Sequence, residues 1–483
     1  MTGLVETIQL APGLRIARVL NGLWQIADSE RAVALDAVAT AQAMAPYVEA
    51  GFTTFDMADH YGSAEVIAGT FRRQHARGGE AQLLTKWVPA PGPVSRNAVR
   101  EAVDRALQRM QGERVDLLQF HAWHYPDPSW LDALFFLDEL RAEGLIRHLG
   151  VTNFDTAHLR IALSSGIPIV SNQLSYSLLD RRAGGSMTAL CEEFGVKLLA
   201  YGTLAGGLLS EAWVDAPEPQ SLSTWSQMKY KRFIDAVGGW APFQRVLSAV
   251  AQVARRHGVS MPVVASRYML DQPAVGGVIM GARLNGKSHV EENLAIFRCS
   301  LDAQDHAVMD SVLATLDPVP GDCGDEYRKA PYLTAAGDLS DHFNTIPPSI
   351  APRRGEDGRV RVFSGTPWEP LAGYCRAVRE GAQISVSGTT ATHGERLIGG
   401  GDPAAQTHFV IDKIEAAISA LGGRLEDVVR TRVFVNDIAD WEPVARAHGL
   451  RFGSICPANT LVEARLVGIG YKVEIEADAW VRR

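Results

Sequence analysis

The sequence has few cysteines and no pattern that would join them. Its five cysteines among 483 residues are scattered, odd in number and without a CxxC pair. They are Cys191, Cys299, Cys323, Cys375 and Cys456. This scarcity excludes a disulfide framework and a cysteine-based zinc site, and it fits a reducing cytoplasm. We therefore expect a cytoplasmic protein that holds no metal.

Long apolar runs and a basic excess are also missing. No stretch is apolar enough to span a bilayer, and the first residues lack the features of a secretory signal, so we expect no membrane association. The net charge of −8 disfavours nucleic acid as a partner. It leaves room for a phosphorylated small molecule, because such a ligand is held by a few local groups.

The chain is long enough for two domains, and its pattern changes near the middle. Regular periodicity disappears between residues 318 and 360, where prolines and glycines concentrate. We predict a first domain over residues 1–320, a tail and linker over 321–362, and a second domain over 363–483. The stretch GDCGDEYRKAPYL, from residue 321, either folds over the first domain or belongs to the linker.

The first domain alternates strand-like runs with helical spacing. One predicted helix covers residues 95–110, with Ser95 as its N-cap, and another covers 243–257. The apolar runs are RVLNGLWQI, TTFDMAD, QLLTKWV, DLLQFHAW, RHLGVTN, PIVSNQL, KLLAYGTL and GGVIMGA. Eight strand–helix units predict an α/β fold, a (β/α)8 TIM barrel. The longest interruption, about 210–240, is rich in large aromatics and is either a substrate wall or loop packing.

Polar side chains stand near the ends of these predicted strands. Asp56, with Tyr61 close behind it, follows the second strand, Lys86 ends the third and His121 ends the fourth. Further polar residues follow the later strands: Asn153, Gln173, Tyr201 and Arg283. In a parallel barrel all these ends share one face, which is where active sites are built.

The residue types at these strand ends suit carbonyl reduction. A carbonyl needs a hydride at carbon and a proton at oxygen. Tyrosine is a weak acid, but the ammonium of Lys86 would lower the pKa of Tyr61, and Asp56 would hold Lys86. His121 would donate to the substrate oxygen or orient it. Each residue alone is also common as a structural group, so the prediction depends on their combination.

The motifs FDMADHYG, LLTKW, DLLQFHAW, GVTNF, NQLSY and AYGTLAGGLL resemble the aldo-keto reductase superfamily, over nearly all of residues 15–320. The resemblance implies a catalytic tetrad of Asp56, Tyr61, Lys86 and His121, with Tyr61 as general acid. It also implies a nicotinamide cofactor, NADP(H) or alternatively NAD(H), and a small carbonyl substrate. The residues it places at the nicotinamide and pyrophosphate are Gly22, Trp24, Asn153, Gln173, Tyr201, Gly202, Thr203 and Leu204.

Residues 281–288, GARLNGKS, match a phosphate-binding P-loop pattern. A P-loop belongs to an open sheet with a magnesium-binding acid, whereas this stretch follows the eighth barrel strand. We interpret it as a site for the 2′-phosphate of NADP at a helix N-terminus. The residues predicted to contact the adenosine end are Gly281, Arg283, Lys287, Ser288, Glu292 and Asn293. The chain has His289 where many family members carry arginine.

The second domain combines strands and two helices on a mostly antiparallel plan. Predicted strands start at AQISVSGTT, VVRTRVFVND, ANTLVEARL and KVEIEADAW, and helices cover 406–421 and 441–453. Residues 368–483 resemble the Rid family, also called YjgF-like, a small α+β fold of the chorismate-mutase-like type. That resemblance implies a homotrimer with ligand clefts between subunits. Cleft candidates are Tyr374, Thr389, Asn459 and Glu476.

The Rid-like cleft departs from the family at one position. Family members that hydrolyse imines use an arginine two residues after a proline, and here Pro457 is followed by Ala458 and Asn459. An amide cannot replace a guanidinium in capturing a carboxylate, which argues against imine hydrolysis by this domain.

Taking both domains together, we predict an NADP-dependent carbonyl reductase whose second domain trimerises the chain or binds a ligand. The alternatives are an NADP(H)-binding redox sensor and an imine or enamine hydrolase.

Overall fold

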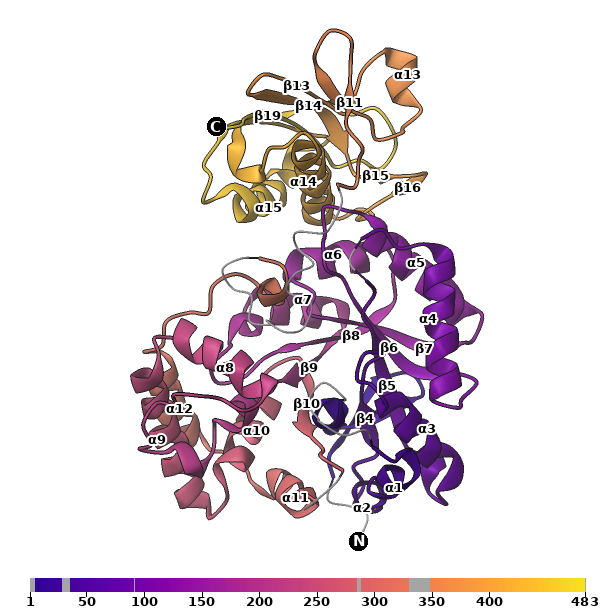
Figure 1. The fold of residues 1–483 in the computed structure, drawn as a ribbon. Coiled ribbons are helices and arrows are strands. Elements are labelled where there is room, and N and C mark those ends of the chain that lie inside the picture. Colours follow the sequence, from indigo (N-terminus) through magenta and orange to yellow (C-terminus); the bar gives the residue numbers. More distant parts are fainter. Residues whose placement is uncertain (1–4, 28–34, 91, 285–287, 330–347, 483) are drawn as a thin grey trace.

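The computed structural model describes residues 5–27, 35–90, 92–284, 288–329 and 348–482. Within these residues the first domain is a closed barrel of eight parallel strands, as predicted (Figure 1). The barrel strands are β3 (Val19–Gly22), β4 (Thr54–Asp56), β5 (Gln82–Trp87), β6 (Val115–His121), β7 (Ile146–Thr152), β8 (Ile169–Ser175), β9 (Lys197–Tyr201) and β10 (Val275–Gly281). Each strand coincides with one of the predicted apolar runs, and β10 pairs with β3 to close the ring.

Helices cover the outside of the barrel (Figure 1). They are α1 (Ala37–Gln42), α2 (Ala45–Glu49), α3 (Ala64–Gln74), α4 (Arg96–Arg109), α5 (Ser129–Ala142), α6 (Thr156–Ser164), α7 (Ser186–Phe194), α8 (Trp225–Ala236), α9 (Trp240–His257), α10 (Met261–Leu270), α11 (Val290–Arg298) and α12 (Ala303–Leu313). The side chain of Ser95 caps α4 by accepting from the backbone N–H of Ala98, as the sequence predicts. Helix α9 ends at Gly258, which takes the left-handed conformation typical of a helix C-terminus.

A hairpin closes the end of the barrel opposite the predicted site. It consists of β1 (Thr7–Ala11) and β2 (Leu14–Ala17). Its buried side chains form one apolar cluster with residues from inside the barrel: Leu10, Leu14, Ile16, Leu20, Leu84, Leu117 and Leu199. Leucine and isoleucine therefore fill this end of the barrel. The polar residues lie at the opposite end, where the strands run into the strand–helix loops.

The aromatic-rich interruption after β9 is not one continuous loop. It contains α8, which the sequence analysis placed inside the 210–240 loop. The side chain of Thr224 caps α8, and Phe233 and Ile234 bury its inner face. Short 3-10 helices occur here and elsewhere: η1 (Leu23–Ile26), η3 (Gly78–Glu80), η4 (Arg182–Gly184), η5 (Ala205–Gly207), η6 (Glu211–Trp213), η7 (Asp325–Tyr327), η9 (Leu425–Asp427) and η10 (Ile438–Asp440).

The C-terminal part is a smaller α+β domain, also as predicted. Its described residues form a seven-stranded sheet in the order β11-β12-β13-β14-β19-β17-β18, in which β17 and β18 are parallel and the other pairs antiparallel. The strands are β11 (Arg353–Arg354), β12 (Val360–Val362), β13 (Ala377–Glu380), β14 (Gln383–Thr390), β17 (Val428–Val435), β18 (Ala458–Glu463) and β19 (Val473–Trp480), with a separate pair β15 (Thr392–His393) and β16 (Arg396–Leu397). Strands β11 and β12 lie within the segment predicted as tail and linker.

Helices α14 (Pro403–Ala420) and α15 (Trp441–Phe452) cover one face of this sheet, and a short helix, α13 (Trp368–Ala372), precedes β13. Asp402 caps α14 by accepting from two backbone N–H groups. The four residues predicted to face inward from α14 are all buried: Phe409, Ile414, Ala417 and Ile418. Helix α14 therefore packs its apolar side chains against the sheet, on strands β14 and β19.

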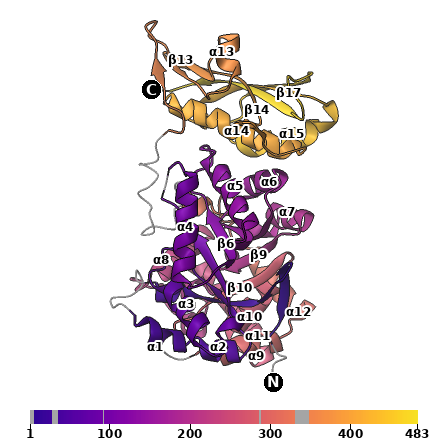
Figure 2. The ribbon, with the colours of Figure 1, turned by 90° about the vertical axis from the view of Figure 1, so that its right-hand side faces the viewer.

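The two domains contact each other through helices. Helices α14 and α15 face the barrel, and α14 packs against α6 (Figure 2). Polar contacts cross the boundary: Arg160 donates to Asp402 over 2.7 Å, and His158 lies 3.0 Å from a carboxylate oxygen of Asp412. On the other side of the contact, His393 of β15 lies 3.0 Å from Asp132 of α5.

Candidate active site at the barrel rim

The predicted acid and lysine form a buried ion pair at the end of the barrel. Asp56 is the last residue of β4, and Lys86 lies one residue before the end of β5. Lys86 Nζ donates to Asp56 Oδ2 over 2.7 Å, and both side chains are about 95% buried. Burial lowers the pKa of the Lys86 ammonium, and the Asp56 carboxylate opposes that shift. The Asp56 carboxylate therefore offsets part of the cost that burial imposes on the charge of Lys86.

Two glutamine side chains hold the other oxygen of Asp56. Gln173 Nε2 donates to Asp56 Oδ1 over 2.7 Å, and Gln119 Nε2 donates to the same atom over 3.1 Å. Gln173 also donates to Gln119 Oε1 over 2.9 Å. Gln119 was not predicted as a site residue, although it lies two residues before His121 on the same face of β6. Gln173, predicted to bind the nicotinamide carboxamide, here supports the carboxylate of the ion pair.

Tyr61 lies beside this ion pair. It follows β4 in the loop before α3, and Lys86 Nζ is 5.0 Å from the centroid of its ring. The ring of Trp24 meets that of Tyr61 edge-on, with 5.0 Å between centroids. The structure thus brings together Asp56, Tyr61 and Lys86, and it places Trp24 against the tyrosine.

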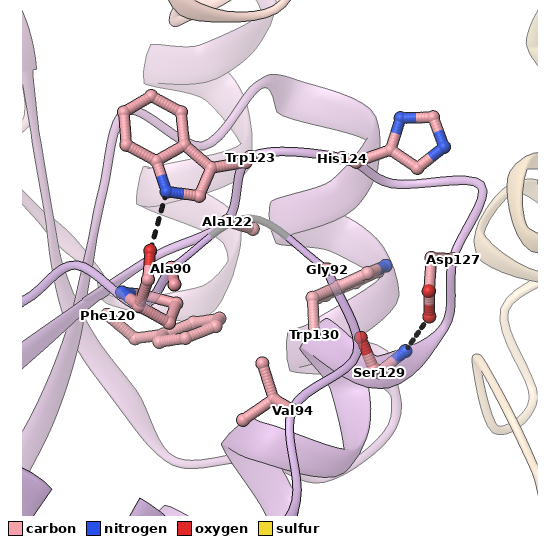
Figure 3. Close-up of a pocket in the computed structure, with 11 residues that line it drawn as sticks. Ala90, Gly92, Val94, Phe120, Ala122, Trp123, His124, Asp127, Ser129 and Trp130 are labelled. Atoms are coloured by element: carbon pink, nitrogen blue, oxygen red, sulfur yellow. Dashed lines mark hydrogen bonds between the residues drawn. The ribbon is translucent and has the colours of Figure 1, made fainter. Parts of the chain in front are cut away.

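His121 ends β6 and is buried beneath aromatic rings. Its Nδ1 lies 3.3 Å from the carbonyl oxygen of Thr152, the last residue of β7, which fixes the plane of the imidazole. The ring of Trp123 meets it edge-on at 4.3 Å, and the ring of Tyr327 does so at 5.5 Å. Trp123 Nε1 donates to Pro89 O, which ties the loops after β5 and β6 together around a small pocket (Figure 3).

Tyr327 belongs to the segment after α12, so part of the predicted tail does cross the barrel mouth. Its hydroxyl lies 3.1 Å from that of Tyr201 and accepts a hydrogen bond from Lys229. Tyr201 in turn donates to Asn153 Oδ1 over 2.7 Å. Burial raises the pKa of Tyr201 well above its usual value. Asn153 and Tyr201, both predicted to lie at the nicotinamide, are thus hydrogen-bonded to each other. Tyr327 and Lys229 were not predicted from the sequence.

Two further predicted cofactor positions are glycines at which an added side chain would clash with a neighbouring residue. A Cβ on Gly22 would come within 2.7 Å of Ile279, and one on Gly202 would meet the ring of Tyr230 at 2.6 Å. Gly202 also has a φ of +82°, a conformation that favours glycine. The next two predicted residues, Thr203 and Leu204, follow it directly, with Thr203 buried against Met280.

The predicted adenosine end lies around the start of α11. Gly281 ends β10, Arg283 is exposed, and Ser288 Oγ accepts from the backbone N–H of Val290 in the first turn of α11. Lys287, also predicted there, lies outside the described residues. Glu292 accepts a hydrogen bond from Ser260, and Asn293 is buried beneath the helix.

The aromatic side chains of the 210–240 segment divide between two roles. The rings of Trp213 and Trp240 meet edge-on, with 5.8 Å between centroids, and Trp240 Nε1 donates to Ala216 O. These contacts join the two ends of the segment and stabilise its conformation. Tyr230 of α8 reaches the rim at Gly202. Trp225 is partly exposed.

The four predicted cleft residues of the second domain are spread over its sheet. Thr389 and Tyr374 both lie at the buried guanidinium of Arg376, which donates to the hydroxyl of each. Asn459 donates to Thr431 over 2.8 Å. Glu476 lies 3.2 Å from the guanidinium of Arg432. Since neighbouring residues of a strand point to opposite faces, Asn459 shares the face of Thr431, whereas Glu476 shares that of Arg432.

Clusters of metal-binding side chains and membrane-spanning helices are absent from the part of the chain that the structure describes. No group of three or more His, Cys, Asp or Glu residues is placed there to hold a metal ion. No described helix is long and apolar enough to cross a membrane. All five cysteines are free.

The barrel sequence matches a known family over most of its length. The model of the aldo/keto reductase family matches residues 18–314, which is more than half of the chain. The chain belongs to the aldo/keto reductase family. A second family model, Endoribonuclease L-PSP, matches residues 366–481, so this aldo/keto reductase carries a second domain of another family.

Individual relatives match one domain or the other. The flagellar radial spoke protein 5 of Chlamydomonas reinhardtii is 29% identical over 257 residues, 44% of this aldo/keto reductase and 49% of that protein, so the chain spans about half of its length. The NADH-specific methylglyoxal reductase of Escherichia coli is 24% identical over 343 residues. The match covers 63% of this chain and 97% of that protein.

The second domain resembles a solved structure. Rv2704 from Mycobacterium tuberculosis, described as a member of the YjgF/YER057c/UK114 family, is 44% identical, covering 26% of this chain and 99% of that one, with a TM-score of 0.24. The match of the Endoribonuclease L-PSP model to residues 366–481 agrees with the YjgF-like motifs of the sequence.

Proposed function

We propose that this protein transfers a hydride between a nicotinamide cofactor and a small aldehyde or ketone, or the corresponding alcohol, with Tyr61 as the general acid or base. The observation that carries the proposal is the Lys86–Asp56 pair, whose ammonium lies 5.0 Å from the centroid of the Tyr61 ring. A positive charge at that place favours the phenolate form of a tyrosine. Tyr61 could then exchange a proton with the substrate oxygen.

The network around Asp56 supports this role for Lys86. Two amide N–H groups and one ammonium donate to its carboxylate. The ion pair with Asp56 keeps Lys86 beside Tyr61 despite the cost of burial. His121 lies at the end of the neighbouring strand β6, oriented by the carbonyl of Thr152, and we assign it to positioning the substrate oxygen.

The residues at the rim fit a nicotinamide cofactor, which when bound supplies the hydride. Tyr201 presents an aromatic ring at the end of β9, and Asn153 an amide beside it. At the other end, the exposed guanidinium of Arg283, the hydroxyl of Ser288 and the N-terminus of α11 form a donor set suited to phosphate. This set favours NADP(H). A relative named as NADH-specific makes NAD(H) the alternative.

For the whole chain we propose a cytoplasmic enzyme with a barrel domain over 1–320, a tail and linker over 321–362 and a YjgF-like domain over 363–483. A homotrimer would form through the second domain, as the family resemblance implies. Asn459 in place of the family's arginine argues against imine hydrolysis by that domain.

Absorbance of NADPH and of NADH in the presence of a panel of aldehydes, ketones and sugars tests the proposal. Oxidation of a nicotinamide cofactor that depends on a carbonyl compound is the expected result. Tight cofactor binding without turnover on any of them would contradict the proposal and favour a redox sensor.

A further inference from the structure

One arginine of the tail ties together the two strand ends next to His121. Arg328 donates twice to the carbonyl of Ala122, over 2.9 and 2.7 Å, and once to that of Asn153, over 2.6 Å. Ala122 directly follows His121 at the end of β6. Asn153 directly follows Thr152, whose own carbonyl faces the imidazole. A single guanidinium therefore spans β6 and β7 where the site residues emerge.

The tail can approach the rim this closely because of Gly324. Its φ is +79°, and a Cβ at this position would lie 2.0 Å from the carbonyl oxygen of Asn153. Any other residue would push the tail off the end of β7. Gly324 also accepts from Arg328 over 3.1 Å, which closes the turn that aims the guanidinium.

The guanidinium is held from the side of the second domain by two stacked rings. Arg328 lies 4.4 Å above the centre of the Tyr125 ring. On the ring of Tyr125 lies the imidazole of His158, at 3.5 Å between centroids and 5° between planes. Tyr125 and His158 are both about 95% buried, so neither has room to turn away.

His158 is one of the residues through which the two domains contact each other. Its Nδ1 lies 2.6 Å from Asp155 of the barrel and its Nε2 lies 3.0 Å from Asp412 of α14. Arg451 of α15 donates to Asp412 over 2.6 Å and to Glu415 over 2.7 Å. Burial opposes a charge on His158, but the two carboxylates outweigh it and raise its pKa.

We infer that the YjgF-like domain acts as a positioning element for the reductase site, through the contact series Asp412, His158, Tyr125 and Arg328. Arg328 is the positioning residue, and it acts on His121 and Asn153 by fixing the ends of their strands. This inference rests on the proposed function for its kinetic consequence, but not for its structural one. It gives the second domain a role in catalysis that needs no ligand of its own.

Hydrogen exchange of the full-length protein, with no cofactor or substrate, tests the structural consequence. In Arg328→Gln and in Asp412→Ala we expect backbone amides of residues 120–124 and 152–155 to exchange about tenfold faster than in the unaltered protein. The matched control is Arg160→Gln, which breaks the interdomain ion pair with Asp402 but has no contact in the series. Unchanged exchange at both strand ends in Asp412→Ala would overturn the inference.

Kinetics separate positioning from general destabilisation. We expect kcat to fall about tenfold in both variants, measured at a temperature well below the thermal midpoint of each. Arg328→Lys should give an intermediate kcat, because an ammonium keeps the charge but cannot span two carbonyls in a fixed fork. A kcat in Asp412→Ala equal to that of Arg160→Gln would overturn the inference. If the unaltered protein reduces no carbonyl, the proposed function fails, and the exchange result still decides the positioning role.

Discussion

The predicted site residues lie close together at the barrel rim but on opposite faces of the C-terminal sheet. At the rim, Asp56 and Lys86 come from different strands and lie 2.7 Å apart. In the C-terminal sheet, Asn459 and Glu476 come from strands that both flank β17 but point to opposite faces. All strand ends of a parallel barrel share one edge, whereas a mixed sheet has two faces and no such meeting point. A cleft built from the C-terminal residues would need a second copy of the chain, in line with the proposed trimer.

The largest effect should come from removing the charge at the rim. In Lys86→Met we expect kcat/KM to fall about 1,000-fold, because Tyr61 loses the ammonium that favours its phenolate. Steady-state rates of cofactor oxidation measure this. Lys472→Met is the matched control, since that lysine pairs with Asp440 in the other domain. A loss of similar size in the control would break the contrast between the two regions.

Core truncations test whether the two regions have separate cores. Phe409→Ala on α14 should lower the free energy of unfolding of the C-terminal domain by about 3–5 kcal/mol, because its ring is fully buried. Phe243→Ala on α9 should do the same for the barrel. Denaturant titration followed by domain-specific probes measures both. Equal losses in both domains from either variant would show one cooperative unit instead.

The predicted phosphate site at α11 should show a smaller effect. Arg283→Ala should raise KM for NADPH about tenfold and change KM for NADH little, because the guanidinium would contact only the extra phosphate. Initial rates with each cofactor give the comparison. Arg298→Ala, at the far end of the same helix, serves as control. Equal changes for both cofactors would rule out Arg283 as the 2′-phosphate contact.

The smallest effect is a dependence of the domain interface on pH. The pKa of His158 is raised above its ordinary value of 6.5, so its contribution to stability is fully present below that value and lost as the pH rises through the higher value of the folded state. Groups facing it are Asp155, Tyr125, Trp130, His408, Asp412 and Arg451. One proton limits the slope to about 1.4 kcal/mol per pH unit.

Unfolding midpoints of the full-length protein, measured from pH 6 to 9 in buffers of equal ionic strength, test this. We expect the unaltered protein to lose stability as the pH rises and His158→Phe, which keeps a ring on Tyr125, to lose less. The carboxylate of Asp412 works in the opposite direction, since its pKa is lowered and its contribution disappears toward acid pH. Parallel pH profiles for the two proteins would exclude His158 as the titrating group.

The barrel and the acid–lysine pair were predictable because they follow from local patterns. Apolar runs gave all eight strands, and strand order alone puts Asp56 and Lys86 on one rim. The amphipathic spacing of α14 likewise predicted four of its buried side chains, but not the polar Asp412, which is buried against His158 of the barrel. Helix α8 was missed because prolines precede it and two glycines follow it, which is typical of a loop.

Contacts that depend on side-chain direction or on distant segments were not predictable. Nothing in the sequence distinguishes Gln173 bound to Asp56 from Gln173 facing a ligand. Tyr327 reaches Tyr201 from 126 residues away, and His158 meets Asp412 from 254 residues away. Such contacts form only when distant helices and strands pack together, so a local sequence pattern cannot predict them.

The most direct test of this account compares Tyr61→Phe with Asn459→Ala in the same carbonyl reduction assay. Because the chemistry is proposed to occur at the barrel rim, Tyr61→Phe should abolish turnover while Asn459→Ala leaves kcat/KM within about twofold of the unaltered protein. Turnover that survives in Tyr61→Phe but is lost in Asn459→Ala would contradict the account and move the active site to the C-terminal sheet.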